Sequence, residues 1–180
     1  MKKKLVLALA LLLFAGFAFY MGGTKKAVEV KGLITSCTQI PINSSVTKGT
    51  QVPCIDGGPG VIMESIKGPA VINVWGSWCA PCVAEMPHFI ELAKTKKVTI
   101  IGVDVEEKDS QAGKKFIRTH GITWPVLFDP DSRTKSLYGI GVPVTWFINA
   151  QGEVAYRHAG IIASKEILFS EVKKYLGITV

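Results

Sequence analysis

Short apolar runs alternate with longer amphipathic stretches over most of this chain. Runs rich in β-branched and aromatic residues predict strands at 61–63, 70–75, 98–105, 125–128, 145–148 and 153–158. Apolar residues at helical spacing predict helices just after residue 78 and at 110–120, 132–138 and 164–176. Strands that alternate with helices and end in a hairpin indicate an α/β fold, a three-layer α/β/α sandwich around a mixed central sheet.

Local signals limit two of these helices. Ser110 and Ser164 are the expected N-caps, because a hydroxyl oxygen can accept a hydrogen bond from a free amide of the first turn. Gly121 and Gly177 are the expected ends, because glycine adopts the left-handed backbone that commonly ends a helix.

The N-terminal segment differs from the rest of the chain. A basic start, Met1 to Lys4, precedes seventeen apolar or small residues from Leu5 to Met21. This run is long for a signal-peptide core and slightly short for a spanning helix, so residues 1–24 are predicted to be a signal-anchor. The alternative is a cleaved signal peptide and a secreted protein. Residues 25–53 are expected to be a tether and irregular lead-in, and residues 54–180 the folded domain.

The charge of the chain bears on location more than on partners. The formal net charge is +7, but without the five lysines that flank the apolar segment the chain has sixteen basic and fourteen acidic residues. Nucleic acid is therefore not an expected partner. The basic start would remain in the cytoplasm, which places the domain on the extracytoplasmic side of the cell membrane.

The sequence Trp78-Cys79-Ala80-Pro81-Cys82 lies where a predicted strand meets a predicted helix. Thiols at this spacing can close and open a disulfide and so transfer two electrons. The amides and dipole of a helix N-terminus stabilise a thiolate, so Cys79 is the expected exposed nucleophile. Cys82, one turn deeper, would resolve the mixed disulfide, and Trp78 supplies an apolar surface beside the thiol.

A structural zinc site is the alternative for this cysteine pair. Zinc ordinarily requires a second pair of cysteines or histidines at short spacing, and sixteen residues separate the other two cysteines, Cys37 and Cys54. We therefore expect neither a metal nor another cofactor. Cys37 and Cys54 are expected to form a structural disulfide, with an electron-relay pair as the alternative.

Several separated motifs together resemble the thioredoxin fold. Pro87 follows Cys82 by five residues, where members of the family kink this helix, and Gly141-Val142-Pro143-Val144-Thr145 is similar to the cis-proline loop of the family. Glu85-Met86-Pro87 and Tyr156-Arg157-His158-Ala159-Gly160 resemble the membrane-tethered TlpA-like branch, which includes the thiol–disulfide reductases of cytochrome c maturation. The resemblance covers about residues 61–176.

The resemblance implies roles for three further residues. Pro143 would be cis and pack against the dithiol, and the backbone of Val142 would pair with an extended substrate. Glu85 would lie beneath the dithiol and accept a proton from Cys82, although a surface glutamate favoured by the helix dipole explains it equally well. Asn73 stands where thioredoxins have a buried acid, and Val144 stands where some cytochrome-maturation members have one.

The predicted function is that of an extracytoplasmic thiol–disulfide oxidoreductase that reduces protein disulfides. Its partners would be exported protein thiols and disulfides, a membrane dithiol electron carrier or oxidant, and the membrane itself through the N-terminal helix. An oxidase or isomerase that introduces disulfides is the first alternative, because Ala80 and Pro81 do not fix the direction. A redox-sensitive binding module without turnover is the alternative from another class.

Overall fold

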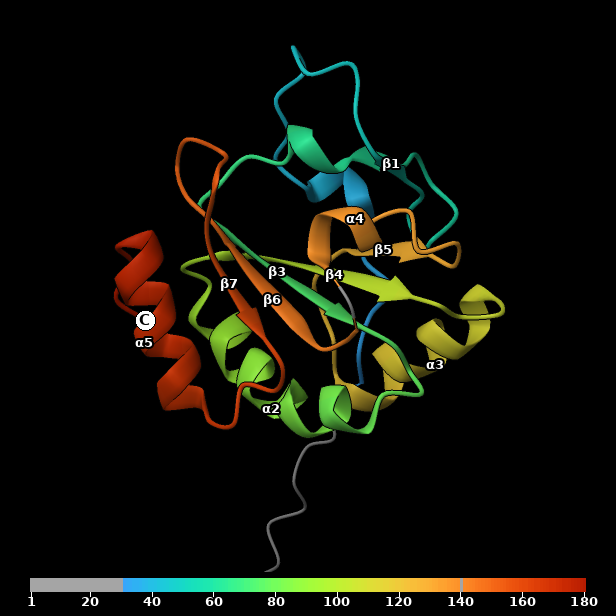
Figure 1. Cartoon of the computed structure of the whole chain (residues 1–180). Coiled ribbons are helices and arrows are strands. Elements are labelled where there is room, and N and C mark those ends of the chain that lie inside the picture. The colour runs from blue at the N-terminus through green and yellow to red at the C-terminus, as the bar shows by residue number, and fades with distance from the viewer. Residues whose placement is uncertain (1–30, 140) are drawn as a thin grey trace, which may run out of the picture. The chain divides into compact units, whose positions relative to one another are not determined.

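A five-stranded mixed sheet lies at the centre of the structure, a computed structural model that describes residues 31–139 and 141–180 (Figure 1). The sheet order is β5 (Val126–Asp129), β4 (Thr99–Val105), β3 (Ala70–Trp75), β6 (Val144–Ile148) and β7 (Val154–Ala159). β3, β4 and β5 are parallel, while β6 is antiparallel to β3 and β7 is antiparallel to β6. The predicted α/β fold with a mixed sheet is confirmed, and strand ends differ from the prediction by one residue at most.

β3 is the central strand, and all six of its residues are buried. It pairs with β4 on one side and β6 on the other, and elements cover both of its faces. A strand buried on two faces is encoded as a nearly continuous apolar run, which explains why Ala70–Trp75 is so apolar. The exception is the polar residue Asn73, which forms a hydrogen bond with Glu85.

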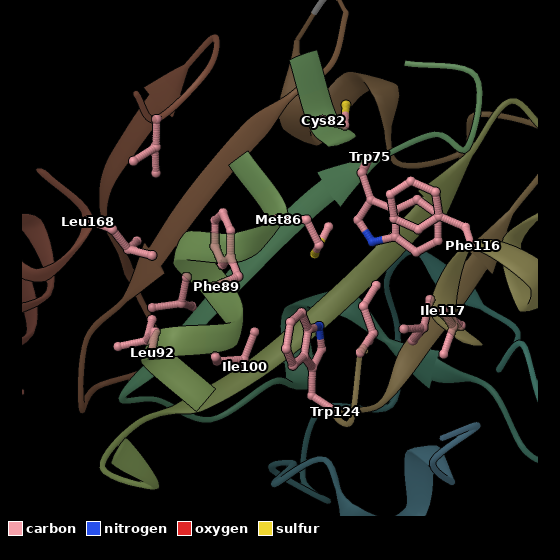
Figure 2. Close-up of a cluster of buried hydrophobic side chains, with 14 of the residues drawn as sticks. Trp75, Cys82, Met86, Phe89, Leu92, Ile100, Phe116, Ile117, Trp124 and Leu168 are labelled. Carbon is pink, nitrogen blue, oxygen red and sulfur yellow. The ribbon is translucent and has the colours of Figure 1, made fainter. Parts of the chain in front are cut away.

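Three helices cover one face of the sheet: α2 (Ala80–Thr95), α3 (Ser110–His120) and α5 (Lys165–Leu176) (Figure 1). The buried side chains of α2, among them Met86 and Phe89, follow the helix across this face (Figure 2). The ring of Trp75 stacks on that of Phe116 from α3, with ring centroids 4.4 Å apart. This packing fixes both helices relative to the end of β3.

The opposite face is covered by the short helix α4 (Lys135–Tyr138) and by the segment before β3. That segment contains the 3-10 turns η1 (Cys37–Gln39) and η2 (Met63–Ser65), and the short antiparallel strands β1 (Gln51–Val52) and β2 (Val61–Ile62). Ile40 and Val52 are buried in the core. The compact unit therefore begins at residue 31 and not at residue 54, because the apolar side chains of the lead-in have a sheet face to cover.

The helix limits agree with the sequence except at two helix starts. The helix predicted at 132–138 begins at Lys135, because residues 129–134 form a turn in which the Asp129 carboxylate accepts hydrogen bonds from the amides of Arg133 and Thr134. Ser164 caps α5, and Gly121 and Gly177 end α3 and α5 in the left-handed conformation. For α3 the cap is Asp109 and not Ser110, because the Asp109 carboxylate accepts a hydrogen bond from the amide of Gln111 at 2.7 Å. An acid at this position also complements the helix dipole.

The predicted signal-anchor at 1–24 and the first part of the tether lie outside the described residues. Within the ranges 31–139 and 141–180, no helix has the length and apolar character needed to cross a membrane.

A disulfide joins Cys37 of the lead-in to Cys54, and the two Cα atoms are 5.9 Å apart. Both cysteines are buried on the sheet face opposite the one that α2 covers. The cross-link therefore fastens η1 to the segment that precedes β2.

We predict that replacing both Cys37 and Cys54 by serine lowers the free energy of unfolding by about 3 kcal/mol, because the unfolded chain regains the entropy of an open loop. Urea unfolding of the oxidised protein measures this change. The matched control replaces Cys79 and Cys82 by serine. Because these cysteines close a much shorter loop, their replacement should lower the free energy of unfolding by less. An equal loss in both double variants would contradict the loop-entropy account.

Candidate active site

The cysteine pair lies at the junction of β3 and α2. β3 ends at Trp75, a turn brings the amide of Cys79 within 3.0 Å of the Gly76 carbonyl, and α2 begins at Ala80. Cys79 occupies the N-cap position, and its Sγ accepts a hydrogen bond from the amide of Cys82 at 3.2 Å. A sulfur in this position would be stabilised as a thiolate by that amide and by the dipole of a sixteen-residue helix.

Cys79 and Cys82 form a disulfide with an S–S distance of 2.06 Å. Cys79 is 4% exposed and Cys82 is fully buried. The expected order of accessibility is therefore present, but Cys79 is not the exposed residue that the sequence predicted. Both cysteines lie at the start of α2. Figure 2 shows Cys82 at that end of α2, above Trp75.

Trp78 is 54% exposed beside this nearly buried disulfide. Its ring lies against Gly76, where an added Cβ would be 2.6 Å from Trp78 Nε1, so a side chain at this position would displace the ring. The amide of Ser77 donates a 2.6 Å hydrogen bond to Glu107 Oε1. The loop after β4 thus holds the turn that carries Trp78 in place.

The loop before β6 contains a cis peptide bond between Val142 and Pro143. The Pro143 carbonyl accepts a hydrogen bond from the amide of Gly160 at 3.0 Å, which links the loop to the end of β7. Val142 is half-buried and packs against both core clusters, including the one that contains Cys79 and Cys82. A second cis bond, between Gly68 and Pro69, precedes β3 and was not expected from the sequence.

Glu85 is completely buried on α2, one turn after Cys82. Its Oε1 accepts a hydrogen bond from Asn73 Nδ2 and its Oε2 accepts one from the amide of Ile162, each at 2.9 Å. Burial raises the pKa of Glu85 to about 7, although the two hydrogen bonds and the charge of His158 act in the opposite direction. Residues three apart share a helix face, so this carboxyl lies on the side of α2 that carries Cys82.

A second buried acid, Asp104, was not recognised from the sequence. It is the register partner of Trp75, and its carboxyl faces that of Glu107, with which it forms a hydrogen bond when one of the two is protonated. Burial, reinforced by the neighbouring Glu107 carboxylate, raises the pKa of Asp104 to about 9. A Cβ on Gly113 would lie 1.9 Å from Asp104 Oδ2, so α3 packs directly over this group. The sequence signal that could have revealed this group is an acidic residue within the otherwise apolar run of β4.

No group of three or more potential metal-ligating side chains occurs in the part of the chain that the structure describes. All four cysteines are engaged in the two disulfides. Trp75, Trp124 and Trp146 are core residues, as expected. His120 packs on Phe116, while His158 pairs with Glu171 of α5 at 2.8 Å.

We predict that Asp104→Asn raises the free energy of unfolding at pH 7 by on the order of 2 kcal/mol. The folded-state pKa of Asp104 lies above the unfolded value, so the fold binds a proton that the unfolded chain releases. The contribution of Asp104 to stability is therefore fully present below about pH 4 and is lost as the pH rises toward 9. The variant should lose this decline, as measured by urea unfolding at several pH values.

The matched control for this prediction is Asp131→Asn, which changes an exposed acid that pairs with Arg133. It should leave the slope of stability against pH unchanged. An Asp104→Asn protein with the slope of the wild type would show that Asp104 is ionised in the fold.

Comparison with known proteins agrees with this geometry. The AhpC/TSA family model matches residues 48–157. The chain is 36% identical over 122 residues to the thiol-disulfide oxidoreductase ResA of Bacillus thuringiensis (strain Al Hakam), covering 65% of this chain and 69% of the relative. It is 31% identical over 174 residues to the thiol:disulfide interchange protein DsbE of Pasteurella multocida (strain Pm70), covering 92% and 91%.

The solved structure of StoA from Bacillus subtilis is similar to this structure, with a TM-score of 0.54 and 25% sequence identity. The match covers 66% of this chain and 91% of StoA. A disulfide at the start of α2, a cis proline in the loop before β6 and these matches lead to one assignment. The chain belongs to the AhpC/TSA family and is a thioredoxin-like enzyme of the thiol–disulfide oxidoreductase group.

Proposed function

We propose that the protein reduces disulfides of exported proteins on the extracytoplasmic side of the membrane. The observation that carries this proposal is the buried carboxyl of Glu85 one turn after Cys82, with its pKa raised to about 7. Oxidation of a dithiol requires that the resolving thiol lose a proton, and a carboxyl with this pKa can accept it near neutral pH. The same carboxyl would return the proton when the disulfide is reduced, so the direction proposed here follows the reductases that the sequence resembles, and the reduction potential tests it.

In the first step, the Cys79 thiolate attacks one sulfur of the substrate disulfide. A mixed disulfide forms, and the other substrate sulfur leaves as a thiolate that takes a proton from solvent. In the second step, Cys82 attacks Cys79 Sγ, the mixed disulfide breaks and the second substrate thiolate leaves. The Cys82 proton passes to the Glu85 carboxylate. One disulfide is reduced and the Cys79–Cys82 disulfide replaces it, with two electrons transferred.

Trp78, Val142 and Pro143 would dock the substrate around the disulfide. Trp78 offers an exposed apolar ring. The backbone of Val142 makes no hydrogen bond to any other residue in the described ranges, so an extended peptide can pair with it as an added strand. Pro143 has no amide hydrogen to compete at this position.

The proposed location and partners rest on three supports. Two disulfides in one small domain are typical of proteins outside the cytoplasm. Residues 1–24 have the sequence of a signal-anchor, which would tether the domain to the membrane. Each turnover leaves the active site oxidised, so a membrane dithiol carrier would supply the next electron pair. On the family resemblance, the cysteines of apocytochrome c are candidate substrates.

The Cys37–Cys54 disulfide acts as a structural cross-link in this proposal, and not as an electron relay. Its cysteines belong to the core cluster on one face of the sheet, whereas Cys79 and Cys82 belong to the cluster on the other face. Thiol–disulfide exchange requires direct contact of sulfur with sulfur. The sheet separates the two pairs.

We predict that Cys79→Ser abolishes the reduction of insulin disulfides by the protein, because no nucleophile remains. Cys82→Ser should instead accumulate a mixed disulfide with the substrate, visible as a higher-mass species on a non-reducing gel. The dithiol should have a reduction potential near about −270 mV in a redox buffer, as expected for a reductase. A value near about −120 mV would assign an oxidase. Full turnover by Cys79→Ser would contradict the mechanism.

We further predict that Glu85→Gln slows the oxidation of the dithiol by a small disulfide about 100-fold, because the amide cannot accept the Cys82 proton. The wild-type rate should rise as Glu85 ionises near pH 7, and this component should be absent in the variant. Single-turnover kinetics between about pH 5 and 9 measure both effects. The control is Glu91→Gln on the same helix, an exposed residue that pairs with Lys94. Equal profiles for the two variants would remove Glu85 from the mechanism.

A further inference from the structure

A row of polar side chains crosses the helix-covered face of the sheet. Asn73 of β3 is the register partner of Thr145 of β6, and Thr145 is the partner of His158 of β7. Directly paired residues of antiparallel strands project from the same face and are close neighbours. Asn73 and Thr145 are fully buried, while the side chain of His158 is 20% exposed. The row therefore leads from the centre of the sheet to its edge.

The two ends of the row are acidic groups on helices. At the inner end, Asn73 donates a hydrogen bond to Glu85 of α2. At the outer end, His158 Nδ1 is 2.8 Å from Glu171 Oε1 of α5, whose side chain is 13% exposed. An apolar row would be the ordinary composition of a face that three helices cover, so the polar residues need a reason.

Several polar atoms along this row lack a hydrogen-bond partner in the described part of the chain. They are Asn73 Oδ1, Thr145 Oγ1 and Glu171 Oε2. Buried polar atoms are almost always paired in native proteins, and exceptions commonly mark a catalytic role or an ordered water. The row thus has unused hydrogen-bonding capacity along its whole length, between the active site and the surface.

The groups that face Glu85 come from each element packed around it. β3 contributes Asn73 and the loop before α5 contributes the amide of Ile162. β7 contributes His158, whose charge lowers the pKa of Glu85, and α2 itself contributes the dithiol. Asn73 and the amide cannot take up a proton at neutral pH. Among these described neighbours, His158 is the group outside the dithiol that can exchange one with Glu85.

Because Glu85 is fully buried, a proton taken from Cys82 cannot pass directly to bulk water. A carboxyl that keeps its proton cannot accept another in the next cycle. The hydrogen bond to Glu171 engages Nδ1 of His158, which leaves Nε2 as the basic nitrogen of the neutral ring.

We propose that His158, oriented by Glu171, is a positioning residue that exchanges the proton of Glu85 with solvent along the row through Thr145. The proposal rests on the proposed role of Glu85 as proton acceptor. The proton leaves Cys82 for the Glu85 carboxylate, passes to the imidazole of His158 and leaves from there to water. Both electrons remain in the newly formed disulfide, so no group in the row is oxidised or reduced. Reduction of the disulfide runs the same path inward.

The test follows the reaction of the reduced full-length protein with Ellman's disulfide. The first thionitrobenzoate is released when Cys79 attacks, and the second when Cys82 resolves the mixed disulfide. His158→Gln keeps a hydrogen-bonding group toward Glu171 but cannot carry a proton near neutral pH. We expect the second release to slow at least about 10-fold in this variant, while the first release is unchanged.

His158→Ala supplies a readout that a packing role would not produce. Its second release should be equally slow, and added imidazole should restore most of the rate in a saturable manner. Glu171→Gln, which removes the charge that orients the ring, should show an intermediate loss. His120→Gln is the matched control, because His120 lies at the end of α3 and contacts Phe116 outside the row.

The outcomes separate this inference from the function on which it rests. A slow Glu85→Gln protein together with His158 variants at the wild-type rate overturns the exchange path and leaves the role of Glu85 intact. A loss in His158→Ala that imidazole does not restore, with His158→Gln at the wild-type rate, also overturns it by showing a packing role. An unaffected Glu85→Gln protein removes the proposed proton acceptor and the path together.

Discussion

The Glu85 carboxyl depends on an unusual balance between burial and hydrogen bonding. A fully buried carboxylate without partners would be strongly disfavoured, and its protonated form would persist well above neutral pH. Two donors, Asn73 Nδ2 and the amide of Ile162, partly offset that penalty and bring the pKa to about 7. Both protonation states are then accessible at the pH at which the enzyme would work. A hydroxyl or amide in the same place would lack this property.

The sheet and the helices together determine the surroundings of the Glu85 carboxyl. β3 supplies Asn73, which donates a hydrogen bond to Glu85. The turn after β3 leads directly into α2, so the cysteines and Glu85 lie in the first two turns of that helix. The amide of Ile162 comes from the connection between β7 and α5, far along the chain. The contacts of α5 with α2 and of Trp75 with Phe116 hold these parts together. The active site is thus a consequence of how one face of the core packs.

The parts of this arrangement that are local in sequence could be predicted. The apolar run of β3, the cysteine spacing and the caps Ser164 and Gly177 each depend on a few neighbouring residues, and all agree with the structure. The partners of Glu85 could not be predicted, because Ile162 is 77 residues away. The packing of residues 31–53 was missed for the same reason, since Ile40 and Val52 are buried only when the sheet is in place. The low exposure of Cys79 likewise depends on the core cluster to which it belongs, which residues far along the chain complete.

Two buried acids lie near the end of β3, and their surroundings give them different chemistry. Asp104 is buried and its carboxyl faces that of Glu107, and both conditions favour its protonated form, with a pKa of about 9. Glu85 has two donors and a histidine nearby, which favour its ionised form. When their surroundings give two acids of one site different pKa values, the acid whose pKa lies near the working pH is suited to proton transfer. Asp104 then remains a neutral group beside the loop that holds Ser77, and Glu85 is the acid that would change its charge in the proposed cycle.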